Sequence, residues 1–218
     1  NLNLDRSSEF TGNWIISLAA GNDELNSAKL KNADSIDMGA GDDKVKLMLT
    51  GSNGTNTIAN ANLVKLDGGA GRDTLFFEES GASTTALTLS TANASNFENI
   101  VGTDGAETIT GDANDNYLAG GNYGGSSTVV DTLNGEAGND LLIASYNTTG
   151  LCNDCFNEIP YNNPIANLFS KPNYETFTYS SSSYFSSSAS HIFNGGAGDD
   201  VILGGKGDET FNGGAGKD

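Results

Sequence analysis

The sequence GGAGDDVIL at residues 195–203 is followed without a gap by GGKGDETFN at residues 204–212. The first stretch fits the nine-residue pattern G-G-x-G-x-D-x-U-x, in which U is a large apolar residue. The second differs only at its sixth position, where Glu209 replaces the aspartate. A third copy begins at Gly213 and reaches its sixth position at Asp218. Tandem copies of a short unit predict a solenoid, in which each unit packs only on its neighbours.

Further copies of the pattern occur throughout the N-terminal two thirds of the chain. Residues 68–76 fit it fully, and residues 38–46 and 135–143 each depart from it at one position. Weaker copies occupy residues 102–110 and 111–119. Because the copies at 38–46 and 68–76 are thirty residues apart, each unit of this half contains one glycine turn and one less regular coil. This half is therefore expected to be an irregular solenoid.

The nine-residue spacing has a physical explanation. Glycines at the first, second and fourth positions allow tight turns with positive φ and close approach of the backbone. The apolar residue at the eighth position lies on a short strand, where alternate side chains face opposite sides, so it is expected to point inward. Two units make one coil of about 18 residues, and coils stack roughly 4.8 Å apart. The predicted fold is an all-β parallel β-helix or β-roll solenoid with glycine–aspartate turns.

These repeats resemble the RTX family, the hemolysin-type calcium-binding nonapeptide repeats of secreted bacterial proteins. The resemblance implies several Ca²⁺ ions between turns of neighbouring coils, bound by carboxylate and backbone carbonyl oxygens, which suit a hard cation. The implied carboxylate ligands are Asp43, Asp73, Asp140, Asp200 and Asp218, with Glu209 and Glu107 as weaker candidates. The implied carbonyl donors are Gly39, Gly41, Gly69, Gly71, Gly196, Gly198, Gly205 and Gly207. The alternative is a solenoid whose turns bind no metal.

The charge of the chain also favours a bound cation. The 218 residues include 28 acidic and 10 basic side chains, which gives a formal net charge of −18. An acidic chain of this strength repels phosphate backbones, so a nucleic-acid partner is not expected. No stretch approaches the roughly 20 apolar residues of a membrane span. Residues 73–170 contain no lysine or arginine, so their carboxylates cannot be neutralised by basic residues of the same stretch.

We expect three regions along the chain. Residues 1–143 form the irregular β-helix, residues 144–193 an aromatic and serine-rich insertion, and residues 194–218 a truncated β-roll. The insertion contains all three prolines and the single histidine. Its tyrosines, serines and asparagines are typical of adaptable recognition surfaces. It either contacts a partner, such as a glycan, a cell-surface molecule or a second copy of the chain, or packs on its own solenoid.

The two cysteines lie close together in the sequence, and motifs typical of catalysis are missing from it. Cys152 and Cys155 form a CxxC sequence, which occurs in redox motifs, zinc sites and small disulfides. A local disulfide is the favoured interpretation, and free thiols are the alternative. The chain lacks an HExxH motif and a nucleophile-elbow motif. We therefore expect that this chain is not an enzyme.

Three functions remain open at this point. The first is a calcium-stabilised structural or adhesive protein of a surface layer, filament or adhesin. The second is the RTX module that supports secretion and stability of an enzyme such as a protease, lipase or alginate-modifying enzyme. The third is a carbohydrate-binding module that uses the insertion. The expected location is extracellular or at a bacterial cell surface. The chain starts without methionine and stops within a repeat, so we expect it to be a fragment.

Overall fold

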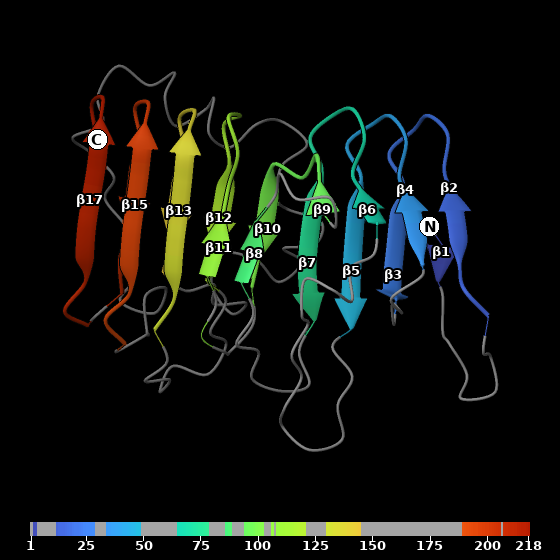
Figure 1. Ribbon diagram of the computed structural model, residues 1–218, viewed down its shortest axis with the longest axis horizontal. Coiled ribbons are helices and arrows are strands. Elements are labelled where there is room, and N and C mark those ends of the chain that lie inside the picture. The colour runs from blue at the N-terminus through green and yellow to red at the C-terminus, as the bar shows by residue number, and fades with distance from the viewer. Residues whose placement is uncertain are drawn as a thin grey trace, which may run out of the picture.

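The computed structural model describes residues 2–3, 12–28, 34–48, 65–78, 86–88, 94–102, 106, 108–120, 130–144, 189–205 and 207–218. These residues contain strands and no helix. All strand pairs are parallel, and the chain winds as a solenoid whose coils stack along the long axis (Figure 1). The fold predicted from the nine-residue period is confirmed.

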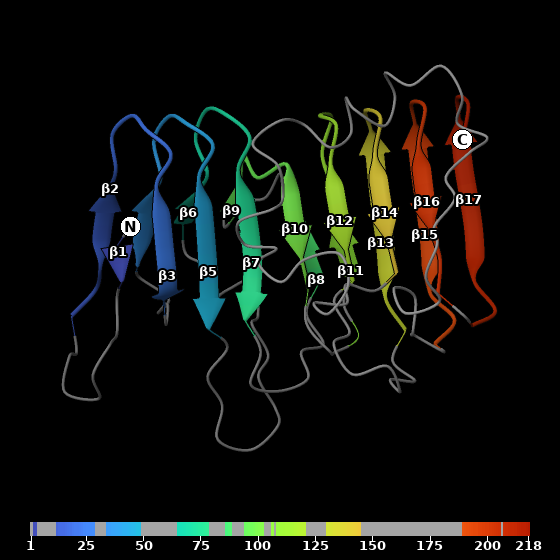
Figure 2. The ribbon, with the colours of Figure 1, turned by 180° about the vertical axis from the view of Figure 1, so that it is seen from behind.

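One face of the solenoid is an eight-stranded parallel sheet with the order β1-β3-β5-β7-β10-β12-β14-β16. Figure 2 shows this face with its strands side by side from the N-terminal to the C-terminal end. Its strands are β1 (Leu2–Asn3), β3 (Glu24–Ala28), β5 (Lys44–Met48), β7 (Thr74–Glu78), β10 (Asn99–Val101), β12 (Tyr117–Ala119), β14 (Leu141–Ile143) and β16 (Val201–Leu203).

Two shorter sheets form the other face, one in each half of the solenoid (Figure 1). The four-stranded sheet contains β2 (Ile15–Ser17), β4 (Ser35–Asp37), β6 (Lys65–Asp67) and β9 (Ala94–Ser95). The five-stranded sheet contains β8 (Ala86–Thr88), β11 (Thr108–Thr110), β13 (Thr132–Ala137), β15 (Ile192–Ala197) and β17 (Thr210–Ala215). Each coil therefore crosses from one face to the other at two turns.

The core between the two faces is built from the inward positions of the strands. The eighth-position residues of five strands are fully buried: Leu25, Val45, Leu75, Leu118 and Leu142. Each pairs in register with its counterpart in the neighbouring coil, except that β10 lies between Leu75 and Leu118. Burying each such side chain contributes about 1.5–3 kcal/mol. The opposite face supplies Ile36, Leu66, Ile109, Leu133 and Phe193, which belong to the same cluster.

The strands on either side of the predicted insertion pair with each other. β13 pairs with β15, and β14 pairs with β16, so the solenoid is continuous across residues 145–188. Ala144 and Phe193, the limits of the predicted insertion, are both buried in the core. The residues 145–188 themselves lie outside the described part of the chain, together with Cys152 and Cys155.

The glycine turns use positive φ at the second and fourth positions of the unit. Gly69 and Gly71 have φ of 99° and 145°, and Gly196 and Gly198 have 114° and 145°. The first-position glycines, such as Gly195, are not among the residues with positive φ. The expectation of positive φ was wrong for that position, whereas the expected close approach of the backbone is confirmed there. Glu136 stands at a second position and has φ of 77°.

We predict that Glu136→Gly stabilises the protein. A side chain in the left-handed region costs about 1–2 kcal/mol, and glycine avoids this cost. Part of the gain in stability is lost, because glycine also gives the unfolded chain more conformational freedom. The net gain should be roughly 1 kcal/mol, measured as a higher urea midpoint in calcium-containing buffer. Glu136→Ala is the control, because alanine keeps the Cβ atom. Equal gains in both variants would contradict the backbone explanation.

Candidate calcium-binding edge

The turns that carry the best nonapeptide copies lie along one edge of the solenoid, between the shorter sheets and the eight-stranded sheet. We call this the glycine-turn edge. It contains residues 18–23, 38–43, 68–73, 96–98, 111–116, 135–140, 195–200 and 213–218. The turns between the eight-stranded sheet and the shorter sheets form the opposite edge.

The sixth-position residues on the glycine-turn edge bind to one another through the coils. In each case the side-chain oxygen of one coil accepts the backbone N–H of the sixth residue in the preceding coil. The donor and acceptor pairs are Asp23 to Asp43 (2.7 Å), Asp43 to Asp73 (2.7 Å), Asp73 to Glu98 (2.8 Å), Asn116 to Asp140 (2.8 Å), Asp140 to Asp200 (2.8 Å) and Asp200 to Asp218 (3.3 Å). We call these eight residues the sixth-position row.

The second carboxylate oxygens of this row are buried without partners. Among the described residues, the Oδ2 atoms of Asp43, Asp73, Asp140 and Asp200 have no hydrogen-bond donor. A buried ionised oxygen without a partner costs free energy, because it loses its water and gains nothing in exchange. A cation bound between the coils would satisfy these oxygens.

Glycine at the first position creates the space beside each of these oxygens. A methyl group placed on Gly135 would lie 2.2 Å from Asp140 Oδ2 and 2.5 Å from the carbonyl oxygen of Gly195 in the next coil. At Gly195 the corresponding distances are 2.3 Å to Asp200 Oδ2 and 2.4 Å to the Gly213 carbonyl oxygen. A carboxylate oxygen and a carbonyl oxygen from successive coils thus approach the same glycine, where a side chain would collide with both. This donor set fits Ca²⁺, which takes several oxygens from carboxylates and carbonyls.

No group of three or more carboxylate, histidine or cysteine ligands occurs among the residues that the structure describes. Each ion would therefore take one or two carboxylates of the sixth-position row and complete its shell with turn carbonyls. When bound, it would supply positive charge between coils that otherwise repel.

A second row of hydrogen bonds runs beside the first in the opposite direction. Here the fifth-position side chain accepts the backbone N–H of the fifth residue in the following coil. Examples are Asn139 Oδ1 with Asp199 N–H (2.8 Å) and Asp199 Oδ1 with Lys217 N–H (2.9 Å). The sequence interpretation missed this row. Its signal is the aspartate or asparagine at the fifth position of most copies: Asn22, Asp42, Asp115, Asn139 and Asp199.

The electrostatics of the sixth-position row follow from its burial. Burial raises the pKa of Asp73 to about 8 and the pKa of Asp140 to about 7. The pKa values of Asp43 and Asp200 are also raised by burial, and neighbouring carboxylates raise them further. Backbone N–H donors oppose these increases. Without a metal, Asp73 and Asp140 thus hold protons near neutral pH, and a divalent cation would replace them.

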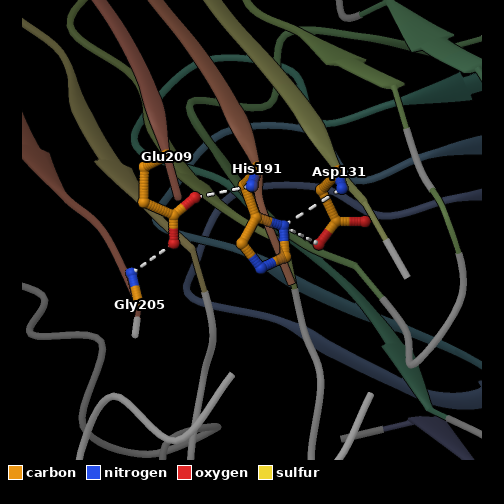
Figure 3. Close-up of polar contacts among 4 residues, drawn as sticks. All are labelled: Asp131, His191, Gly205 and Glu209. Carbon is orange, nitrogen blue, oxygen red and sulfur yellow. Dashed lines mark hydrogen bonds and ion pairs between the residues drawn. The ribbon is translucent and has the colours of Figure 1, made fainter. Parts of the chain in front are cut away.

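The opposite edge has a different set of residues in the equivalent row (Figure 3). Asp131 donates its backbone N–H to Nδ1 of His191 at 3.0 Å, and the Asp131 Oδ2 lies 3.3 Å from the same nitrogen. His191 in turn donates its backbone N–H to Glu209 Oε2 at 2.5 Å. Glu209 Oε1 accepts the N–H of Gly205 at 2.7 Å. Both oxygens of Glu209 therefore already accept backbone N–H groups.

The structure thus separates the predicted ligands into three groups. The glycine-turn edge brings together Asp43, Asp73, Asp140, Asp200 and Asp218 with Gly39, Gly41, Gly69, Gly71, Gly196 and Gly198. The opposite edge carries Glu209, Gly205 and Gly207. Glu107 lies outside the described residues. Sequence reasoning missed Asp131 and His191, although each stands two residues before a buried apolar residue, as a sixth-position residue does.

Comparison with known families agrees with this geometry. The family model of the RTX calcium-binding nonapeptide repeat matches four stretches, residues 65–79, 96–122, 130–145 and 192–218. The chain carries RTX nonapeptide repeats. The stretches 65–79 and 130–145 each run through one turn of the glycine-turn edge, whereas 96–122 and 192–218 also cross from the eight-stranded sheet to the five-stranded sheet over the opposite edge. No curated protein and no solved structure matches the chain.

RTX repeats bind calcium and are typical of secreted bacterial proteins. The calcium expected from the sequence is therefore supported by the family of the repeats and by the unpartnered oxygens of the sixth-position row. Within the described part of the chain, no helix has the length and apolar character of a membrane span.

We predict that the calcium-free protein is more stable at pH 5 than at pH 8.5. A carboxyl group whose pKa is raised by folding holds its proton in the folded state but not in the unfolded state, so stability falls as pH rises through this window. For Asp73 and Asp140 the window extends from about 4 to the folded pKa values of about 8 and about 7. The measurement is the urea midpoint after exhaustive removal of calcium.

Calcium should reverse this dependence, because the metal binds only the deprotonated carboxylates. Asp140→Asn should reduce the pH effect, whereas Asp208→Asn on the opposite edge, an exposed position, should leave it unchanged. A calcium-free protein that loses stability on acidification from pH 8.5 to pH 5 would contradict the assignment of buried, protonated carboxyls.

Proposed function

We propose that this chain is a calcium-stabilised structural or adhesive segment of an extracellular protein, such as a surface layer, filament or adhesin component, and that it is not itself an enzyme. The observation that supports the proposal is the length of the sixth-position row. It extends from Asp23 in the N-terminal coils to Asp218 in the last turn, along the long axis of the solenoid (Figure 1). Ions bound along such a row would stabilise the packing of the coils over most of the length of the solenoid.

The proposed location follows from the same chemistry. Sites made of single carboxylates and carbonyls bind calcium weakly, at roughly 10⁻⁴–10⁻³ M for extracellular modules. Calcium at these concentrations is available outside the cell but not in the cytosol, so the coils would close after export. Because ligand binding to the folded state adds to folding free energy, export and folding would be coupled.

The second candidate is an RTX module that stabilises a secreted enzyme whose catalytic domain lies elsewhere. The four matches to an RTX repeat support it equally well, since such repeats are typical of secreted bacterial proteins. A carbohydrate-binding role would depend on the insertion between residues 144 and 193, most of which lies outside the described residues. Electron microscopy of the chain in millimolar calcium separates the first two candidates. Filaments or sheets support a structural segment, whereas monodisperse rods argue against self-assembly.

We predict that Asp200→Ala weakens the protein in calcium far more than Asp199→Ala. Each variant loses one hydrogen bond between coils: Asp200 Oδ1 accepts the N–H of Asp140, and Asp199 Oδ1 accepts the N–H of Lys217. Of the two residues, only Asp200 carries an unpartnered buried oxygen. A difference of about 2 kcal/mol would lower the melting temperature by roughly 4–8 °C for a chain of this size. Melting is followed by circular dichroism in calcium and in EDTA.

In EDTA the difference between the two variants should largely disappear, because the metal that distinguishes the two positions is absent. The unmodified chain should also lose most of its β-type signal or its thermal stability in EDTA. An unchanged spectrum and melting temperature after thorough chelation would overturn the calcium-dependent function.

A further inference from the structure

The glycine-turn edge is interrupted at one coil. Six residues separate β4 from β5 and β6 from β7, but only Asn96, Phe97 and Glu98 separate β9 from β10. The flanking strands keep their register, since Ser95 pairs with Asp67 and Asn99 pairs with Thr74. The turn is therefore three residues shorter. Phe97, which precedes Glu98, is buried in the core and offers no acceptor side chain to continue the row of fifth-position hydrogen bonds.

The side chains of Asn96 and Glu98 connect the short turn to the preceding coil. Asn96 adopts φ of 57°, and its Nδ2 donates to Asp67 Oδ1 at 2.7 Å. Glu98 takes the sixth position, and its longer side chain reaches back to accept the N–H of Asp73 at 2.8 Å. Glu98 Oε2 thus has a partner, and Asn116 in the next turn is neutral. Among the described residues, the interval between these two coils contains no unpartnered buried carboxylate oxygen.

Arg72 extends along the edge beside this short turn. Its backbone N–H donates to Asp42 Oδ1 in the preceding coil at 3.0 Å, and its Nη2 donates to the Asp115 carbonyl oxygen at 3.3 Å. Asp115 belongs to the turn at 111–116, two coils further along. The side chain therefore passes the gap left by the short turn and joins the turns on either side of it.

The surroundings of the guanidinium are acidic. The carboxylates of Glu98, Asp115 and Asp42 act on it electrostatically, while its partial burial lowers the pKa of Arg72. Its Nε is buried without an acceptor among the described residues, so charge rather than a full set of hydrogen bonds favours this position. Arg72 puts a positive charge at the fifth position of its turn. Other turns of this edge have a hydrogen-bond acceptor at that position: Asn22, Asp42, Asp115, Asn139 and Asp199.

We propose that Arg72 is a built-in counter-ion that takes the place of calcium at the interval between the turns 96–98 and 111–116. The glycine-turn edge is then divided into two calcium-binding segments, one with Asp43 and Asp73 and the other with Asp140, Asp200 and Asp218. The interval between them stays neutralised whether or not calcium is present. This inference rests on the proposed calcium binding of the flanking segments.

The test compares the full chain with Arg72→Gln, Arg72→Lys and Lys217→Gln. Lys217 is the other fifth-position cation on this edge, but it lies on the exposed last turn. Calcium stoichiometry is measured by native mass spectrometry, and melting is measured in EDTA and in millimolar calcium. Arg72→Gln should melt several degrees lower in EDTA, recover in calcium and bind one additional calcium ion per chain. Arg72→Lys and Lys217→Gln should bind the same number of ions as the unmodified chain.

Several outcomes would overturn the inference. Arg72→Gln that melts like the unmodified chain in EDTA would show that its charge is dispensable. A loss that is equal in EDTA and calcium, with unchanged stoichiometry, would show a packing role only. If Arg72→Gln does not fold, Arg72→Lys decides, because a gain of calcium despite the retained charge would contradict the counter-ion role. If the unmodified chain binds no calcium, the proposed function itself fails, which is distinguishable from failure at Arg72.

Discussion

The buried carboxylate oxygens of the sixth-position row set the main constraint on this solenoid. Parallel stacking in register places the same residue of successive coils roughly 4.8 Å apart. Two like charges at that distance repel by about 1 kcal/mol in water and by about 3 kcal/mol at an effective dielectric constant of about 20. The row contains six aspartates and one glutamate linked by hydrogen bonds along one edge. The fold tolerates this repulsion only if protons, cations or fixed positive groups neutralise it.

The nonapeptide unit provides a place for each part of that solution. The eighth-position residue holds the coils together through the core, and the second- and fourth-position glycines form the turn. The first-position glycine lets the carboxylate approach the backbone closely. The sixth-position aspartate uses one oxygen for the neighbouring backbone, and its other oxygen is buried without a hydrogen-bond partner, where a cation would satisfy it. Structure and metal binding therefore depend on the same residue, which explains why loss of the metal should loosen the coils.

The two edges of the solenoid differ in what satisfies the oxygens of their carboxylates. On the glycine-turn edge, carboxylates accumulate and several of their buried oxygens have no hydrogen-bond partner, so a metal would satisfy them. On the opposite edge, His191 stands between Asp131 and Glu209, and backbone N–H groups satisfy both oxygens of the glutamate. The tandem units at 195–203 and 204–212 look alike in sequence, yet their turns lie on different edges and have different chemistry.

The sequence was sufficient to predict the fold class, the inward position of residues such as Leu75 and Leu142, and the row that contains Asp140 and Asp200. A repeat of fixed period determines which residues stack, because stacking repeats the same position in every coil. Two units per coil place consecutive turns on opposite edges, but the predicted ligand set still grouped Glu209 and Gly205 with Asp200. The role of Gly135 depends on a carboxylate that approaches it from within its own turn. The row of Asp131 and His191 was not recognised, because the insertion separates these two residues in the sequence.

The most direct test of this account is the calcium anomalous signal from crystals grown in millimolar calcium. The account predicts anomalous peaks within bonding distance of Oδ2 of Asp140 and Asp200, bordered by the carbonyl oxygens of the following turn. Peaks confined to the opposite edge would contradict it. So would a well-ordered glycine-turn edge in which those oxygens are hydrogen-bonded to water and no peak lies beside them.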